Sequence, residues 1–445
     1  MLAVKRLFEA LIALGGLLVN IFMLKEQQLR ILVILPLYGG SLPIGHYCVT
    51  ALRDLGHRAE AFSAPDFYPA FAALKNIQIT SDRLAYLENS FLQVVSQAIL
   101  AKVEVFEPDL VLCMAQAPLT HQALKRLRRD NVATAIWFVE DHKLFTYWKA
   151  FAPYYDYFAV IQKDPLLSEL TELGVRALYL PLAALPSLHQ PVEVSAIDQR
   201  RYGSDLSFMG AGYPNRRAAF SQLAQLDFKI WGTEWDDEYA LAPLVQQGGA
   251  RISPEEAVKI YNASKINLNL HSSVRAEALV PGGDFVNPRT FELGACRAFQ
   301  LVDERSLLPD LFAPDELATF RNMDELKSKI DYYLNHEDER LEIAERTRKR
   351  VLEEHTYQRR MSTLIEFIKS TREGWPKDRV RDSGVFIYLP DELKGPAAEL
   401  LTRLNLPADA SFADVIVAIK SEQGQLTELE TSLLFLDEWK KQYGT

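Results

Sequence analysis

Cysteine is scarce in this sequence: the 445 residues contain three, Cys48, Cys113 and Cys296, and none belongs to a Cys-x-x-Cys pair. Zinc knuckles need closely spaced ligands, and disulfide-stapled scaffolds need many cysteines. The sequence therefore excludes both classes and predicts a protein of the reducing cytoplasm.

Positive charge is also in deficit, because 49 Lys and Arg residues stand against 59 Asp and Glu residues, a formal net charge of −10. A protein that holds nucleic acid along its surface needs a broad basic field. We therefore expect no nucleic-acid partner. A small nucleotide needs only a local group of donors, so this class of ligand remains open.

Three signatures of metal or nucleotide binding are missing. The chain has no Asp-x-Asp triplet, with which one class of metal-dependent transferases holds a divalent ion on a diphosphate. It has no Gly-x4-Gly-Lys-Ser/Thr loop, and no Gly-x-Gly-x-x-Gly follows its first apolar run. These absences argue against P-loop NTPases and NAD enzymes and predict that no metal is used.

Long apolar runs are rare as well. Residues 7–24 are just long enough to span a bilayer, but Glu9, Gly15, Gly16 and Asn20 interrupt them. Residues 1–29 are thus an N-terminal apolar helix of uncertain role. The alternatives are a docked helix or translation artefact, a peripheral membrane contact through residues 1–24, and a spanning helix. We expect a cytoplasmic protein, with membrane association left open.

Short apolar runs alternate with helical patterns along most of the chain. Residues 31–37 predict a strand buried on both faces, a turn with Gly39 and Gly40 follows, and a helix begins at His46. The alternation continues to residue 182 and starts afresh at residue 206. This pattern is typical of two doubly wound α/β domains of the Rossmann type.

The pattern predicts where these domains begin and end. We expect a first Rossmann-like domain in residues 30–185, a linker in 186–200, a second Rossmann-like domain in 201–368 and a helical extension in 369–445. The extension is either a cap on the core or, through residues 385–445, an element for docking or oligomerisation.

Two helix starts in the second domain carry residues suited to a diphosphate. Gly210 and Gly212 follow a strand, and Arg216 stands at the next helix start. Small residues let the backbone approach an anion, helix N–H groups point at it, and arginine neutralises its charge. The alternative is an ordinary tight turn with surface arginines.

The second helix start follows residue 286. Asn287 is a good N-cap, and Arg289 and Thr290 lie in the opening turn. Glu292 lies one turn into this helix, where its carboxylate would reach a ribose diol. Alternatively it is a capping-box partner or a favourable charge near the helix start.

Residues 287–292 (NPRTFE), 355–360 (HTYQRR) and 210–216 resemble the CgeB-like (spore maturation protein type) family of glycosyltransferases. The resemblance covers residues 200–365 well and the first half of the chain more loosely. It implies a GT-B fold, in which two Rossmann-like domains face a cleft. It also implies a nucleotide-sugar co-substrate, with a UDP-sugar as one option, held mainly by the second domain, and no other cofactor.

The resemblance extends more distantly to the Glu-x7-Glu motif of retaining GT-B enzymes. Glu292 corresponds to its second acid, which binds the donor ribose. Asp284 corresponds to its first acid, which faces the sugar, and is a departure from glutamate. Arg297, where relatives often have glycine, is a second departure, which affects the turn after the helix.

Further donor-site roles are implied in the second domain. Trp231 and Gly232 would line the base pocket. Lys265 precedes a strand, and His271 lies at the cleft end of that strand, where it would contact the donor. Without the resemblance, a structural histidine is the alternative for His271.

The first domain offers its own candidates for chemistry. The strand at residues 133–139 ends in Glu140, Asp141 and His142. Ionisable groups at the carboxyl end of a strand are suited to act as a general base or to orient an acceptor. Asp141 is our first candidate, and a solvated loop with capping acids is the alternative.

Taken together, the sequence predicts a hexosyl-type glycosyltransferase that is metal-independent and leans to retention of configuration. The acceptor is open among proteins, polysaccharides and small molecules. One alternative is a non-catalytic, nucleotide-sugar-binding scaffold in a glycosylation complex. Another is an enzyme acting on a different phosphorylated ligand, such as a nucleotide-sugar epimerase.

Overall fold

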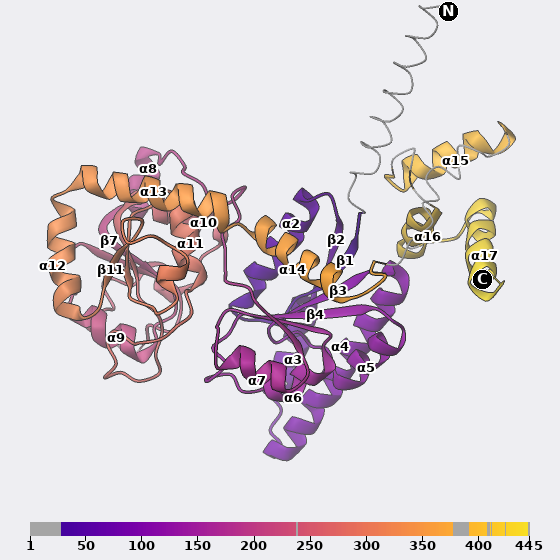
Figure 1. The fold of residues 1–445 in the computed structure, drawn as a ribbon, viewed down its shortest axis with the longest axis horizontal. Helices are drawn as coiled ribbons and strands as arrows, with labels where there is room; N and C mark the ends of the chain where they lie inside the picture. The colour runs from indigo at the N-terminus through magenta and orange to yellow at the C-terminus, as the bar shows by residue number, and fades with distance from the viewer. Residues whose placement is uncertain are drawn as a thin grey trace, which may run out of the picture.

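The computed structural model describes residues 28–236, 239–376, 391–406, 410, 412–422 and 424–443. The apolar N-terminal segment, with its alternative membrane roles, lies outside the described residues except for its last two. In the part of the chain that is described, no helix has the length and apolar character needed to cross a membrane. The described residues form two α/β domains followed by three helices (Figure 1).

The first domain is built on six parallel strands in the order β2-β1-β3-β4-β5-β6. Ile31 and Val33 of β1 pack into the core on one face of the sheet, and Leu32 and Ile34 pack into the core on the other. This confirms the strand buried on both faces. The strands are β1 (Arg30–Ile34), β2 (Arg58–Phe62), β3 (Leu110–Met114), β4 (Ala133–Phe138), β5 (Tyr157–Val160) and β6 (Arg176–Tyr179).

Helices cover both faces of this sheet. α2 lies on one face, and α4, α5 and α7 contribute to the core of the other. The helices of this part of the chain are α2 (Ser41–Asp54), α3 (Tyr68–Leu74), α4 (Ser81–Phe106), α5 (His121–Arg129), α6 (Trp148–Phe151) and α7 (Leu166–Glu172).

The second domain repeats this plan with five parallel strands in the order β11-β10-β9-β7-β8. Its strands are β7 (Ser204–Met209), β8 (Phe228–Trp231), β9 (Ser264–Asn269), β10 (Gln300–Asp303) and β11 (Ala318–Phe320). Its helices are α8 (Ala196–Tyr202), α9 (Pro214–Ser221), α10 (Pro254–Ala263), α11 (Pro288–Ala295), α12 (Met323–Leu334) and α13 (Glu337–Glu354).

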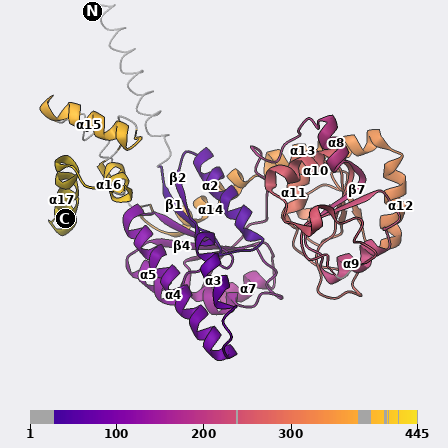
Figure 2. The ribbon, with the colours of Figure 1, turned by 180° about the vertical axis from the view of Figure 1, so that it is seen from behind.

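Two predicted boundaries need correction. α8 begins inside the predicted linker of residues 186–200, where the side chain of Ser195 accepts a hydrogen bond from Asp198 N and caps the helix. α14 (Tyr357–Thr371), expected mostly within the second domain, packs along α2 of the first domain (Figures 1 and 2). Met361 of α14 joins the same core as Ile31. The apolar stripe of a helix does not say which of two sheets it will cover.

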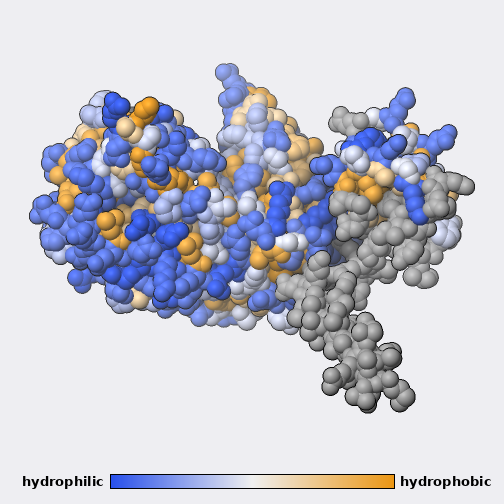
Figure 3. All heavy atoms as spheres, turned by 90° about the horizontal axis from the view of Figure 1, so that it is seen from above, coloured by the Kyte–Doolittle hydropathy of each residue, from blue (hydrophilic) through white to orange (hydrophobic). Residues whose placement is uncertain are grey.

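The C-terminal extension consists of α15 (Asp391–Arg403), α16 (Phe412–Ser421) and α17 (Glu428–Tyr443). These helices share a small core of their own, and α16 contacts α4, with an ion pair between Arg58 and Asp414. They lie on the side of the first domain opposite the second domain (Figure 2). Seen from above, the surface is mainly hydrophilic, with scattered apolar residues (Figure 3).

His355 lies where the chain crosses back to the first domain, and its imidazole is buried. Its Nε2 lies 2.8 Å from the carbonyl oxygen of Leu311, and its Nδ1 accepts a hydrogen bond from Arg360 at 2.9 Å. Burial lowers the pKa of His355 from 6.5 to about 4; the Leu311 carbonyl opposes this change, and the Arg360 cation adds to it. The folded protein therefore holds this imidazole neutral.

Acidification is expected to destabilise the protein through this residue. Because the folded-state pKa lies below the unfolded value, the unfolded chain binds more protons, so the free energy of unfolding falls as pH drops from 6.5 towards 4. The contribution of His355 is about 3 kcal/mol. Urea unfolding at a series of pH values measures it. His355→Gln should lose this part of the pH dependence, whereas a change at the exposed His46 should not; an unaltered slope in His355→Gln contradicts the prediction.

Candidate functional site

Strands β7 and β9 form the topological switch point of the second sheet. The chain runs from β7 to β8 on one side and then returns to β9 on the other. Phe208 of β7 pairs with Leu268 of β9, so Gly210 and Leu270 leave the sheet side by side. Open α/β sheets bind ligands outside the carboxyl ends of their strands at such a point. The predicted glycine turn thus lies at the expected place for a ligand.

Glycine is required in this turn because the backbone is close-packed. Gly210 has a φ of 152° and Gly232 a φ of 111°. A Cβ on Gly232 would lie 2.6 Å from the carbonyl oxygen of Gly210, and a Cβ on Gly210 would lie 2.8 Å from Nη2 of Arg289. Gly212 continues the same turn, with its N–H donating to Thr233 O at 2.9 Å. The two helix starts predicted to grip an anion therefore converge.

Arg289 and Arg216 bring two guanidinium groups to this edge. The central carbon of each lies 5.0 Å from the ring centre of Phe208. Burial lowers the pKa of Arg216 to about 9, and the neighbouring Arg289 cation contributes. Burial also lowers the pKa of Arg289. Two cations held this close favour a bound anion.

The two arginines differ in what their donors contact. Nε and Nη2 of Arg216 donate to Leu270 O at 3.0 and 2.8 Å, and Nη1 donates to Ala211 O at 2.9 Å. Arg216 therefore clamps the ends of β7 and β9 together. Arg289 donates from Nη1 to Asn269 Oδ1 at 3.2 Å. The prediction of direct phosphate contact suits Arg289 better than Arg216, which contributes mainly its charge.

The N-terminus of α11 is fixed by a buried amide network. Asn287 caps the helix as expected, with its Oδ1 accepting from Thr290 N at 3.2 Å. Its Nδ2 donates to Asn269 Oδ1 at 2.8 Å, and Asn269 Nδ2 donates to the Thr290 hydroxyl at 2.9 Å. Thr290 is fully buried. This corrects its predicted donor contact: the hydroxyl holds the helix start instead of facing the cleft.

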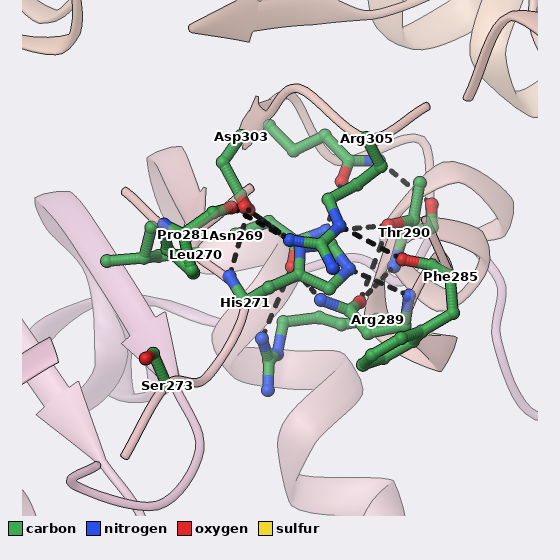
Figure 4. Close-up of polar contacts among 12 residues, drawn as sticks. Asn269, Leu270, His271, Ser273, Pro281, Phe285, Arg289, Thr290, Asp303 and Arg305 are labelled. Atoms are coloured by element: carbon green, nitrogen blue, oxygen red, sulfur yellow. Dashed lines mark hydrogen bonds and ion pairs between the residues drawn. The ribbon is translucent and has the colours of Figure 1, made fainter. Parts of the chain in front are cut away.

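His271, Asp303 and Arg305 form a hydrogen-bonded group that supports the start of α11 (Figure 4). His271 Nε2 accepts from Asn287 N at 3.0 Å, so Nδ1 carries the proton and lies 2.7 Å from Asp303 Oδ1. Arg305 donates to Asp303 Oδ2 at 3.5 Å. Burial by itself would raise the pKa of Asp303. The contact with His271, and to a smaller extent the Arg305 cation, outweigh burial and lower this pKa. His271 is thus the structural histidine that the residues alone favoured, and the donor contact is corrected.

Glu292 lies at the junction of the two domains. Its side chain is 16% exposed, with Tyr261 Oη at 3.4 Å and His189 Nε2 at 4.0 Å. Tyr47 of α2 lies in the first domain, and its pKa is raised by burial and then by the charge of Glu292. The Glu292 carboxylate is therefore close to the first domain. Because Pro288 begins α11, Glu292 lies beyond the N3 position that a capping box requires. That alternative is therefore excluded.

Two predicted donor residues contribute no side chain to this edge: Lys265 lies at the other edge, and Trp231 ends β8 at this one with its ring buried. Lys265 stands at the amino end of β9 and pairs with Asp205 at 2.7 Å, at the opposite end of the sheet from Gly210. Trp231 is 1% exposed and packs against Tyr202, with ring centres 5.7 Å apart. Both predictions are corrected. A lysine near a strand end in the sequence can lie at either edge of the sheet, and an aromatic side chain at a strand end more often packs into the protein core.

In the first domain, the three predicted residues after β4 face different partners. Glu140 accepts from Tyr147 Oη at 2.7 Å and from Gln116, and burial raises its pKa. Asp141 Oδ1 accepts from Lys143 N at 2.8 Å and closes its own loop. His142 is buried and is held by Gln162. These residues stay candidates for catalysis.

The structure adds two residues that the sequence did not single out. Gln162 follows β5, and Asn269 ends β9. The carboxyl end of a parallel strand was the available signal for Gln162 and Asn269. Arg251 of the second domain donates to Gly39 O at 3.1 Å, which brings the first glycine turn to the same junction.

Comparison with known proteins identifies proteins to which this chain is similar. Residues 216–366 match a family described as glycosyl transferase-like. The chain is 27% identical over 256 residues to the spore protein CgeB of Bacillus subtilis (strain 168), covering 55% of this chain and 78% of that protein. The predicted resemblance to CgeB-like proteins is thereby confirmed.

Similar solved structures establish the fold. The sucrose-phosphate synthase of Thermosynechococcus elongatus matches with a TM-score of 0.54 and 12% identity over 77% of this chain and 99% of that one. HepE of Anabaena, solved with UDP and glucose, matches with a TM-score of 0.53 and 11% identity over 77% of this chain and 100% of that one. The fold is GT-B, as predicted.

Proposed function

We propose that this chain, with its GT-B fold and its glycosyl transferase-like domain, moves a hexosyl group from a nucleotide-sugar donor to an acceptor. One observation carries the proposal: the guanidinium of Arg289 lies against the Gly210 turn at the switch point, beside that of Arg216. A diphosphate has the charge and the oxygen acceptors that this pair of cations favours.

The contacts to the rest of the donor follow from this position of the diphosphate. Glu292 supplies a carboxylate to the hydroxyls of a ribose, as the Glu-x7-Glu register suggests. HepE has been solved with UDP-glucose, and by likeness of fold we extend a UDP-sugar donor to this chain as a proposal. Arg289, the charge of Arg216 and the positive end of the α11 dipole neutralise the leaving diphosphate without a metal ion.

The acceptor belongs on the side of the first domain. Asp141 and His142 are the candidates to orient its hydroxyl, and Asp284 stands in the position that faces the donor sugar, which leans to retention. In the reaction the bond from the sugar to the diphosphate breaks, a bond to the acceptor oxygen forms, and the acceptor proton leaves with the diphosphate or a base. Protein, polysaccharide and small-molecule acceptors all suit this scheme.

The test measures UDP binding by calorimetry and sugar transfer by mass spectrometry, across a panel of nucleotide sugars. Glu292→Gln should lower kcat/KM about 10- to 100-fold, because the amide lacks the negative charge and offers one acceptor oxygen in place of two. Lys265→Ala is the matched control and should be unchanged, since Lys265 lies at the far end of the sheet. Activity should persist in EDTA. Absence of nucleotide binding at millimolar concentration would overturn the proposal.

The non-catalytic scaffold predicts a different outcome of the same assay. Nucleotide binding without turnover of any sugar would favour it, and a single transferred product would exclude it. Isomerised donor without transfer would indicate the epimerase alternative. Docking or oligomerisation through residues 385–445 and peripheral membrane contact through residues 1–24 stay predictions.

A further inference from the structure

Gln162 is a buried amide at the carboxyl end of β5, and it contacts both domains. Its exposed fraction is 1%. The side-chain oxygen accepts from His142 N at 2.9 Å and lies 3.0 Å from His142 Nδ1. The side-chain nitrogen donates to Asp284 Oδ1 of the second domain at 2.7 Å. Because His142 N can only donate, the orientation of the amide is fixed.

The same amide sets the state of the imidazole. An oxygen faces Nδ1 of His142, so in the neutral ring Nδ1 carries the proton and Nε2 keeps its lone pair. His142 is therefore presented with Nε2 as an acceptor. The backbone of His142 is held as well, since Trp148 Nε1 donates to its carbonyl at 3.1 Å.

At the other end, the bridge shapes the loop that leads to α11. Asp284 Oδ1 accepts from Gln162 and also from Phe285 N at 2.7 Å. Phe285 O in turn accepts from Arg305 at 3.1 Å. Arg305 lies within electrostatic reach of Asp284 and Asp141. The carboxylate of Asp284 is thus aimed by a residue of the opposite domain.

We propose that Gln162 is a positioning residue that joins His142 and Asp284 in one hydrogen-bonded unit across the two domains. Asp284, which faces the donor sugar, and the imidazole of His142, which lies beside the acceptor, are thereby oriented together. This inference rests on the proposed function. An amide suits this place because its oxygen accepts from His142 while its nitrogen donates to Asp284.

Gln162→Met keeps the length of the side chain and removes both contacts. Transfer should show a fall in kcat of about 10- to 100-fold, while the affinity for UDP is unchanged, because the diphosphate and ribose groups lie elsewhere. Gln162→Glu should be worse, since it sets a carboxylate against Asp284. Lys163→Met is the matched control: it removes a neighbouring exposed contact between the domains, the 2.8 Å pair with Asp310, and should keep kcat.

A double-mutant cycle separates positioning from general damage. Because Gln162 acts through Asp284 as well as His142, Gln162→Met should slow the Asp284→Ala protein by a smaller factor than it slows the wild type. Additive losses would overturn the proposal, as would a fall in UDP affinity equal to the fall in kcat.

A readout independent of activity keeps the two proposals distinct. Hydrogen exchange of peptides covering residues 282–287 should be faster in Gln162→Met than in the wild type, and unchanged in Lys163→Met, because Asp284 anchors the Phe285 amide. Unaltered exchange would refute the bridge even if transfer is observed. Faster exchange in Gln162→Met, together with a failure of the wild type to bind any nucleotide, would support the bridge and contradict the proposed function.

Discussion

Arg289→Ala is expected to weaken UDP binding by about 30- to 1,000-fold, because it removes a half-buried cation from the place proposed for the diphosphate. The side chain lies against Gly210 and donates to Asn269, so its fork is already oriented before any ligand arrives. Arg216 retains its own charge nearby, so some affinity should survive. Isothermal titration with UDP measures the change.

Two further variants make this result specific. Arg289→Lys keeps the charge and loses the planar fork, so its affinity should fall between those of the wild type and the alanine variant. Arg297→Ala removes an arginine just beyond the other end of α11, which is 47% exposed and paired with Glu345, and should leave UDP binding intact. Equal losses in Arg289→Ala and Arg297→Ala would show that net charge alone matters.

Asp303→Ala is expected to lower the free energy of unfolding by about 3 to 5 kcal/mol, because it removes the buried carboxylate that pairs with Arg305 and accepts from His271. Asp303 is 0% exposed, and its partners His271 and Arg305 have side chains that are 1% and 4% exposed. Chemical denaturation measures the loss. The neighbouring Glu304, whose side chain is 54% exposed, is the control, and Glu304→Ala should change stability by less than about 0.5 kcal/mol.

Asp303→Asn tests the cause of this effect. The amide oxygen can still accept from His271, whereas the amide nitrogen would face Arg305 in place of a carboxylate. Its stability should therefore lie between those of the wild type and Asp303→Ala. If Asp303→Ala were as stable as Glu304→Ala, the buried triad would contribute nothing to the position of α11.

Much of the fold could be read from local patterns. The alternation of short apolar runs with helical patterns predicted most strands of both sheets, because a strand covered on both faces needs a continuous apolar run, as in residues 31–34. β2 and β11 were not predicted. β2 has the sequence RAEAF with charges at two positions, and β11 is three residues long, so neither has such a run.

The candidate site was predicted in part. Asn287 as helix cap and the glycine turn at Gly210 follow from local sequence and were found in the structure, whereas the approach of Arg289 to that turn depends on the pairing of β7 with β9. Thr290, His271, Trp231 and Lys265 carry suitable chemistry at suitable positions, yet their side chains face the protein interior or the far end of the sheet. Burial depends on what packs over a residue, and a single sequence does not state that.

The sequence by itself determined the two α/β units, the helix starts and the glycines that let the backbone approach closely, since each depends on residues adjacent along the chain. Only the tertiary structure decided that α14 covers the first sheet, that Arg216 clamps two strand ends, and that Gln162 meets Asp284, 122 positions away. The physical reason is that such contacts depend on how whole elements pack, which no local pattern encodes.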